Sequence, residues 1–309
     1  MKSISAATNK RNHIRAGSRM ADAIIYAVLT VLAFMFLYPL YQVIVCSISD
    51  PNVVATKNSL MLFPEGIQFE AYKVVFHNKN IWTGFKNTLI YLSLGTLLQY
   101  AVTVITAYPL SIKGLAGKKW IMLYFTITMY FGGGIIPYFL LINQLGLMNS
   151  MWVLIIPNAV NVYNMIIMRT QFISLPDDLR EAATLDGAGD LRLLWSVLLP
   201  LSGAVSAVLI LFTAVGYWNM WFDPMIYLTK RSMYPIQSIL REILIDNASI
   251  ASAGRGNAQV KLTKNADQSA VNALIKYANI VVCTVPVLCV YPFAQKYFVK
   301  GVMVGSLKG

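Results

Sequence analysis

The sequence predicts an all-α integral membrane protein with six transmembrane helices, a cytoplasmic helix between spans 4 and 5, and both termini in the cytoplasm. Hydrophobic residues make up 57% of the 309 residues and charged residues 12%, with a mean hydropathy of +0.59. Soluble domains carry about 25% charged residues, so this composition favours a protein that crosses a membrane several times. Apolar stretches of the required length and the uneven placement of Lys and Arg support the same fold class.

Six stretches are apolar over about the 20 residues that a helix needs to cross the hydrocarbon core. They are continuously apolar, whereas the strands of a membrane barrel alternate apolar and polar residues, so we expect helices. The predicted spans are residues 21–47, 88–109, 120–141, 153–169, 193–218 and 274–293. This division predicts a cytoplasmic segment at 1–20, a transmembrane domain at 21–295 and a cytoplasmic tail at 296–309.

Lys and Arg placement gives the orientation, because basic residues gather in short cytoplasmic loops and beside helix ends. The turn at 143–150 contains neither Lys nor Arg, which places it outside. The segments 50–86 and 220–275 are then external loops, and long loops translocate regardless of charge. The membrane topology thus accounts for most of the net charge of +12. This charge therefore does not indicate nucleic-acid binding. The cytoplasmic markers are Lys10, Arg11, Arg15 and Arg19 before the first span and Lys113, Lys118 and Lys119 after the second.

The sequence lacks the features of an enzyme. It contains no Gly-rich phosphate loop followed by Lys and then Ser or Thr, and neither histidine lies beside a nucleophile motif. Its three cysteines show no metal-ligand or disulfide spacing. We therefore predict a transport protein without a catalytic site, metal or cofactor of its own. The cores of the six spans contain essentially no Asp, Glu, Lys or Arg, which argues against an ion-coupled carrier.

A polar, acidic loop at 171–192 separates the fourth and fifth spans. Pro176 followed by two aspartates indicates a helix start, because acidic side chains are favourable near the positive end of the helix dipole. Gly187 suits a left-handed cap at the C-terminal end. We therefore expect a short helix at 177–185.

The spacing of this loop resembles a known motif. An Ala-rich triplet at 181–183 is followed by Gly187 and, after nine more residues, by an apolar group that ends at Pro200. This pattern resembles the EAA loop of the membrane subunits of binding-protein-dependent ABC importers, with Val197 where isoleucine is usual. In that family the loop fits a groove on the cytoplasmic ATPase, so Glu181 would face a basic partner residue, while Leu179, Ala182 and Ala183 would share a closely packing face. The implied coupling residues are Glu181, Ala182, Ala183, Asp186, Gly187, Val197, Leu199 and Pro200.

The resemblance extends beyond the loop. Residues 131–228 are similar to carbohydrate-type permeases of the maltose-transporter kind, and within these to the subgroup for complex oligosaccharides and polysaccharides. The Gly-rich tail resembles one that reaches toward the ATPase, which implies contacts by Gly305, Lys308 and Gly309. The resemblance implies a bacterial cell-membrane complex with a second homologous permease, a dimeric cytoplasmic ATPase that binds ATP and Mg, and an extracellular solute-binding protein.

Amides and aromatic rings mark a candidate path for a sugar. Asn158, Asn161 and Asn164 recur every third residue in the fourth span, with Tyr163 adjacent. Amides can bind sugar hydroxyls, but hydrogen bonds between helices explain such a stripe equally well. A similar cluster at the outer end of the fifth span consists of Tyr217, Trp218, Asn219 and Trp221, where Trp can also be an interfacial anchor.

These observations predict the permease subunit of an ATP-driven oligosaccharide importer that works by alternating access. The basic external residues Lys230 and Arg231 hint at an anionic, uronate-containing saccharide. One alternative keeps this architecture with another polar solute as cargo. A second alternative, an ion-coupled carrier, would transport without an ATPase.

Overall fold

The computed structural model describes residues 2–56, 61–253, 274–290 and 292. These residues fold into helices joined by turns and loops, as the composition predicts. The chain divides into two compact units. Unit 1 comprises residues 1–75 and 250–281, and unit 2 comprises residues 76–249 and 282–309.

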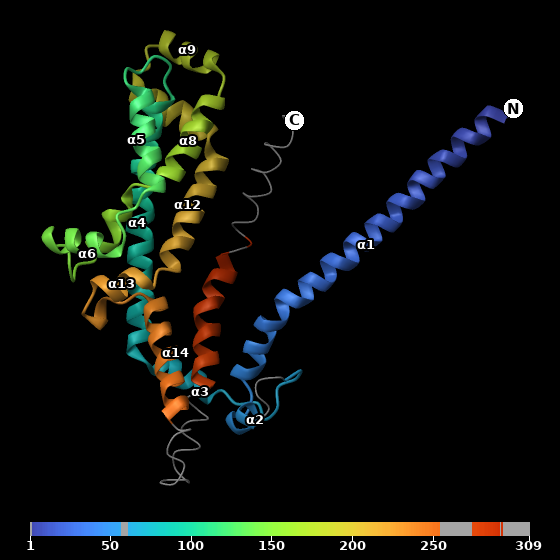
Figure 1. Cartoon of the computed structure of the whole chain (residues 1–309), viewed down its shortest axis with the longest axis vertical. Helices are drawn as coiled ribbons and strands as arrows, with labels where there is room; N and C mark the ends of the chain where they lie inside the picture. Colours follow the sequence, from blue (N-terminus) through green and yellow to red (C-terminus); the bar gives the residue numbers. More distant parts are fainter. Residues whose placement is uncertain (1, 57–60, 254–273, 291, 293–309) are drawn as a thin grey trace. The chain divides into compact units, whose positions relative to one another are not determined.

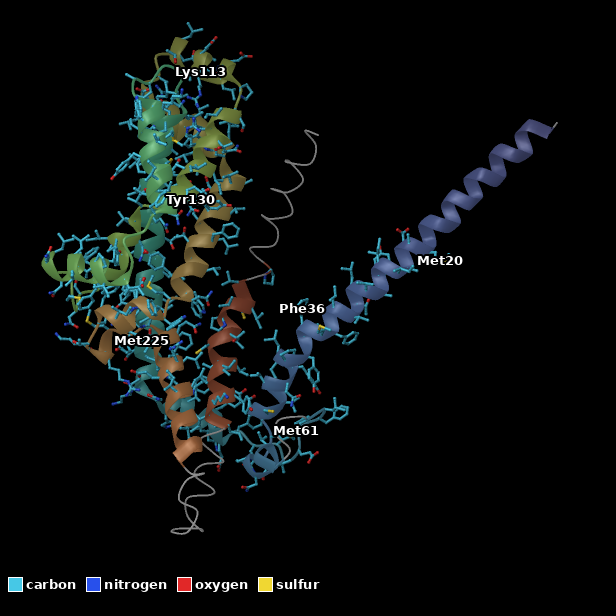
Figure 2. The ribbon with its side chains drawn as sticks, in the orientation of Figure 1. Met20, Phe36, Met61, Lys113, Tyr130 and Met225 are labelled. Carbon is cyan, nitrogen blue, oxygen red and sulfur yellow. The ribbon has the colours of Figure 1, made fainter. Side chains whose placement is uncertain are left out.

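Unit 1 begins with helix α1, Lys2–Ser47. The apolar part of α1, Met20–Ser47, is long enough to cross a membrane and covers the predicted first span. Its side chains project outward along the helix (Figure 2), and Phe36, for example, is 72% exposed. A helix that is apolar on all sides is buried in lipid or protein when it functions, which agrees with a transmembrane role for α1.

The segment after α1 is folded tightly. Asp50 precedes α2, Pro51–Thr56, and its carboxylate accepts a hydrogen bond from the Asn52 N–H at 2.8 Å. The Gln68 side-chain amide also donates to Asp50, at 3.1 Å. Asp50 thus holds Asn52 and Gln68 together within the predicted external loop at 50–86, and the chain leads on into α3, Glu70–His77.

Helix α4, Lys79–Ser111, runs through the centre of unit 2. Helices α8, Val162–Ser174, and α12, Gly203–Trp218, pack along α4, and α5, Lys118–Tyr130, packs on α8 (Figure 1). Met168 and Phe172 lie four residues apart on one face of α8 and are fully buried. With Leu198 and their apolar neighbours they form the core near α9, here called the Phe172 cluster.

The two ends of unit 2 carry different elements. Helix α9, Asp177–Leu185, lies at one end beside Lys113, whereas α13, Phe222–Tyr227, lies toward the other end with Met225 (Figures 1 and 2). Two elements that follow α13 in the chain are hydrogen bonded to α4. They are the 3₁₀ helix η3, Arg231–Met233, and the start of α14, Ile236–Ala253. Tyr91 donates to the Met233 carbonyl at 2.8 Å, and the Ile236 N–H donates to Thr88 Oγ1 at 2.9 Å.

The third predicted span is not a continuous helix. Helix α5 ends at Tyr130, and α6, Ile135–Gln144, turns away from it by 112°. The break falls on Gly132, Gly133 and Gly134, and Gly134 has a φ of +82°, a left-handed conformation that glycine adopts without steric cost. The predicted span over 120–141 therefore consists of two helices in the structure, which are separated at the run of glycines.

The fourth and fifth predicted spans are also interrupted. In the fourth, α7, Trp152–Ile155, leads to a 3₁₀ turn, η1, at Pro157–Ala159 before α8 begins, because proline disrupts the helical hydrogen bonding. In the fifth, α10, Asp190–Leu193, continues into a π-helix, η2, Leu194–Leu198, and α11, Leu199–Leu201, before an 84° bend into α12. Pro200 lacks an N–H donor there, which favours the irregular turn.

The described residues contain two uninterrupted helices long and apolar enough to cross a membrane, or up to four spans if each bent pair counts as one. The helix Leu274–Val290, at the position of the predicted sixth span, is shorter. Helix α4 begins at Lys79 rather than at residue 88, because Asn78 caps it by accepting a hydrogen bond from the Asn80 N–H at 3.0 Å. The end of the predicted external loop 50–86 therefore belongs to α4, and the count of six spans stays a prediction.

Candidate coupling helix and substrate cavity

Helix α9 has the bounds that the sequence predicts, Asp177–Leu185. Pro176 precedes it in an extended conformation, and Asp177 and Asp178 occupy the first turn. Their carboxylates are favourable there because the N-terminal end of a helix carries partial positive charge. None of the nine residues of α9 is fully buried, so its position depends on its ends and on side-chain contacts.

The C-terminal end of α9 is closed by a glycine turn. Gly187 has a φ of +76°. The Gly187 N–H donates to the Thr184 carbonyl at 3.0 Å, and the Ala188 N–H donates to the Ala183 carbonyl at 2.9 Å. This pair of hydrogen bonds is the Schellman arrangement, which satisfies carbonyls that have no partner inside the helix. The predicted left-handed cap is confirmed.

The residues of the triplet 181–183 do not all face the same way. Glu181 and Ala182 are exposed, whereas Ala183 is half-buried against the Phe172 cluster. The expectation that Ala182 and Ala183 share one docking face is therefore wrong in part, because Ala183 anchors α9 to the protein. The outward surface instead includes Leu185, which is 89% exposed, and Asp186.

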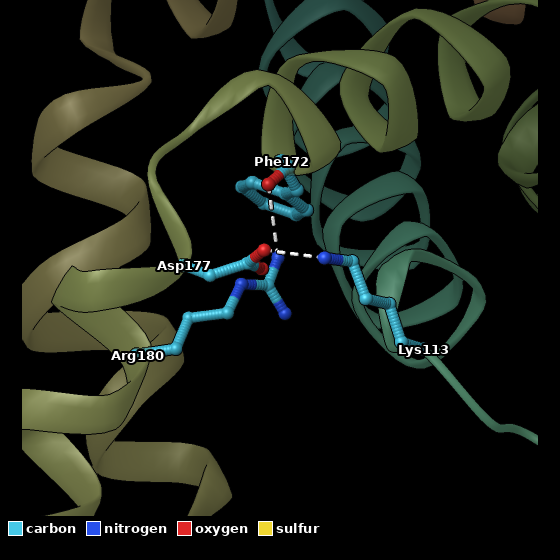
Figure 3. Close-up of polar contacts among 4 residues, drawn as sticks. All are labelled: Lys113, Phe172, Asp177 and Arg180. Carbon is cyan, nitrogen blue, oxygen red and sulfur yellow. Dashed lines mark hydrogen bonds and ion pairs between the residues drawn. The ribbon is translucent and has the colours of Figure 1, made fainter.

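Arg180 ties α9 to the rest of unit 2. Its guanidinium donates to the Phe172 carbonyl at 2.9 Å (Figure 3). It also donates to Ser111 Oγ at 3.2 Å. In the same region Lys113 forms an ion pair with Asp177. Helix α9 is thus connected both to the end of α8 and to the segment that follows α4.

Two further hydrogen bonds extend this connection. The Tyr108 hydroxyl donates to the Asp190 carboxylate at 2.7 Å, and Arg169 donates to the Leu110 carbonyl at 2.8 Å. Arg180 and Tyr108 were not among the residues predicted from the sequence, because Ser111 and Asp190, to which they donate, lie 69 and 82 residues away. The end of α4, the end of α8 and the loop around α9 are joined by polar contacts into one assembly.

The apolar residues in the second half of the motif pack partly against the core of unit 2. Val197 and Leu199 are half-buried against the Phe172 cluster, and Pro200 is exposed where α11 begins to bend. We infer that these residues fix the direction of the chain after α9, whereas the exposed residues of α9 are free to meet a partner.

The Lys113–Asp177 pair gives a prediction with a small effect. Lys113 lowers the pKa of the Asp177 carboxyl below its usual value of 3.8 by a hydrogen bond and by its charge. A carboxyl group whose pKa is lowered by folding stabilises the folded protein at pH values above its usual pKa. This stabilisation is lost only as the pH falls through the lowered pKa, so the ion pair persists at neutral pH. Both side chains are exposed, so we expect Lys113→Met to change transport by less than about twofold. Uptake assays near neutral pH would check this; a loss of function would show that Lys113 does more than pair with Asp177.

A cavity of about 350 Å³ lies between α4, the η1–α8 segment and α12. It is lined by all four candidate residues of the fourth predicted span, three asparagines and one tyrosine. Its described lining residues are uncharged, and they combine amides, hydroxyls and aromatic rings. The lining consists of Gln99, Asn158, Asn161, Tyr163, Asn164, Phe212, Thr213, Gly216, Tyr217 and Met220.

The amides of this cavity also hold the protein together. Asn158 donates to the Leu154 carbonyl at 2.9 Å, and the Asn161 side chain caps α8 by accepting from the Asn164 N–H at 3.0 Å. The Asn164 side-chain amide donates to Thr213 Oγ1 at 3.3 Å, which joins α8 to α12. The hypothesis of hydrogen bonding between helices therefore holds for Asn164, and the same residue also lines the cavity.

Other candidate residues lie elsewhere. Trp218 is 9% exposed, and the centre of its ring lies 6.2 Å from that of Phe85. Of the predicted cluster at the end of the fifth span, Tyr217 is part of the cavity lining, whereas Trp218 and Asn219 are not. The predicted tail contacts Gly305, Lys308 and Gly309 lie outside the described residues. Among the described residues, no group of three or more His, Cys, Asp and Glu side chains could hold a metal ion.

Comparisons with known proteins identify the family. No family model matches the chain. The Bacillus subtilis (strain 168) polygalacturonan/rhamnogalacturonan transport system permease protein YtcP is 36% identical over 296 residues, which cover 94% of this chain and 99% of YtcP.

Solved structures agree with this relationship. A chain of a bacterial ABC transporter that imports the acidic polysaccharide alginate aligns with a TM-score of 0.80 and 31% identity, over 91% of this chain and 97% of that one. A chain of a bacterial alginate ABC transporter in complex with an alginate pentasaccharide-bound periplasmic protein aligns with a TM-score of 0.50 and 18% identity, over 88% and 93%, and supports the fold alone. This chain therefore belongs to the family of sugar ABC transporter permeases.

Proposed function

We propose that the chain is a transmembrane subunit of an ATP-driven importer for acidic oligosaccharides, such as fragments of uronate-containing polysaccharides, in a bacterial cell membrane. The observation that carries the proposal is the similarity along nearly the whole chain to YtcP, whose name gives polygalacturonan and rhamnogalacturonan as its cargo. The structural similarity to an importer of alginate supports an acidic cargo as well.

The cavity supports a saccharide as cargo. Sugars present hydroxyl groups that hydrogen bond to amides, and apolar ring faces that pack on aromatic side chains. Gln99 and Asn158 contribute amides to the cavity, while Tyr163 and Phe212 contribute aromatic rings. Ligand sites combine apolar and aromatic walls with a few placed polar groups in this way.

The remaining parts of the complex are proposed from the same family relationship. A cytoplasmic ATPase dimer that binds ATP and Mg would dock on the exposed residues of α9, and a second homologous permease would complete the path. An extracellular solute-binding protein would deliver the saccharide. ATP-driven closure would then move α9 together with the ends of α4 and α8, because polar contacts join these elements.

ATP hydrolysis by the complex in lipid, with its binding protein, tests this function. The panel contains galacturonate oligosaccharides, neutral oligosaccharides of equal length and a non-sugar polar solute. We expect the acidic saccharides to stimulate hydrolysis most strongly. Stimulation by neutral saccharides alone would overturn the acidic cargo, and stimulation by the non-sugar solute alone would overturn the saccharide. Transport that follows an ion gradient without an ATPase would overturn the importer.

Tyr163 gives a prediction about the cavity. Its side chain is 57% exposed and lines the cavity, so its removal should leave the fold intact. We expect Tyr163→Ala to raise the saccharide concentration for half-maximal uptake about fivefold, which corresponds to the loss of one aromatic contact. Tyr163→Phe keeps the ring and should resemble the wild type. Equal behaviour of Tyr163→Ala and the wild type would remove this residue from the path.

A further inference from the structure

Tyr217, one of the residues that line the cavity, packs against a glycine of α4. Gly95 lies in α4 and faces the ring of Tyr217 in α12. A Cβ atom built at Gly95 would lie 2.1 Å from Tyr217 Cζ, 2.5 Å from its hydroxyl oxygen and 2.6 Å from Cε1. Real Cβ atoms essentially never come within 3.0 Å of another residue's heavy atom. The observed position of the Tyr217 ring is therefore compatible only with glycine at residue 95.

Tyr217 both packs against Gly95 and lines the cavity. Tyr217 is 4% exposed and belongs to the cavity lining, as do Thr213 and Gly216 on the same helix. Its hydroxyl donates to the Leu154 carbonyl at 3.4 Å, a long contact that leaves the ring position dependent on packing. Because interiors are close-packed, a ring pushed away from α4 must move into available space, and the cavity provides it.

We propose that Gly95 is a specificity-determining residue, which acts by seating the Tyr217 ring against the backbone of α4 and so sets the width of the saccharide cavity. The inference rests on the proposed function. Gly95 itself does not touch the cargo, so it is a positioning residue. Any side chain at residue 95 would displace the ring into the cavity and discriminate against larger saccharides.

Uptake of two saccharides by the whole complex tests this inference. In cells that carry the complex with Gly95→Ala, we expect the ratio of galacturonate trisaccharide uptake to disaccharide uptake to fall about tenfold, the lower end of the effect of one methylene in a pocket. Tyr217→Leu removes the part of the side chain that would clash, so the double variant Gly95→Ala/Tyr217→Leu should regain the wild-type ratio or exceed it.

Gly84→Ala is the matched control. Gly84 also lies in α4, and a Cβ atom there would meet Ile239 Cδ1 at 2.6 Å and Ile236 Cα at 3.1 Å, away from the cavity lining. Gly84→Ala also places a methyl group where α4 packs closely on another element, but it should leave the uptake ratio unchanged.

Each result bears on the inference. An unchanged ratio in Gly95→Ala, or an equal change in Gly84→Ala, would overturn it. If Gly95→Ala fails to assemble, Tyr217→Leu alone must raise the ratio by widening the cavity, and an unchanged ratio there would overturn the inference as well. A wild-type complex that takes up no saccharide would instead show that the proposed function is wrong.

Discussion

Replacing Arg180 with alanine is expected to reduce saccharide uptake by about tenfold or more. Hydrogen bonds from a charged group contribute about 1.5–3 kcal/mol, and each 1.4 kcal/mol corresponds to about a factor of ten. Arg180→Ala would leave the Phe172 carbonyl and the Ser111 hydroxyl without this donor, and it would detach α9 from the ends of α8 and α4. Initial rates of uptake, together with the amount of complex in the membrane, would measure the effect.

Two variants control for this prediction. Arg192→Ala removes an exposed arginine from the same loop and should leave uptake near the wild-type rate. Arg180→Lys keeps the charge, but a lysine ammonium lacks the planar fork that reaches both acceptors, so an intermediate rate is expected. Equal rates for Arg180→Ala and Arg192→Ala would contradict a role for Arg180 in positioning α9.

Replacing Gly187 with valine is expected to reduce co-purification of the ATPase by about tenfold. A residue with a side chain costs about 1–2 kcal/mol in the left-handed conformation, and a β-branched residue is strongly disfavoured there. No atom lies within 4 Å of a Cβ built at Gly187, so the backbone conformation alone causes the cost. Loss of the turn would fray the end of α9, where Ala183 and Thr184 accept its hydrogen bonds.

Gly187→Asn separates backbone strain from side-chain volume. Asparagine adopts the left-handed conformation more readily than valine, and the open surroundings accommodate its side chain. We expect this variant to retain most of the ATPase on co-purification. If asparagine and valine lower co-purification equally, the effect comes from a side chain in the docking surface rather than from the turn.

Local signals predicted α9 well. The helix start at two aspartates and the glycine turn at Gly187 depend on residues that are neighbours in sequence, and the structure confirms both. The stripe at Asn158, Asn161 and Asn164 was also informative, because these residues converge on one cavity even though the span is interrupted at Pro157.

Features that depend on distant residues or on single dihedral angles escaped prediction. Hydropathy averages over about 20 residues, so it specifies neither the backbone angles of a single glycine such as Gly134 nor the 112° angle between α5 and α6. Arg180 hydrogen bonds to residues 8 and 69 positions away. The contact between Gly95 and Tyr217 joins two helices whose relative position no periodicity specifies.

The uncharged lining of the cavity has a consequence for the speed of passage. A conduit works when its cargo is held firmly enough to enter and weakly enough to leave. A ring of fixed cations would trap a polyanion in a deep energy minimum, whereas the dipoles of Gln99 and Asn158 create a shallow one. An acidic saccharide would therefore dwell only briefly at this wall, and in the proposed importer the slow step of each cycle would be a step of the ATPase rather than release of the saccharide.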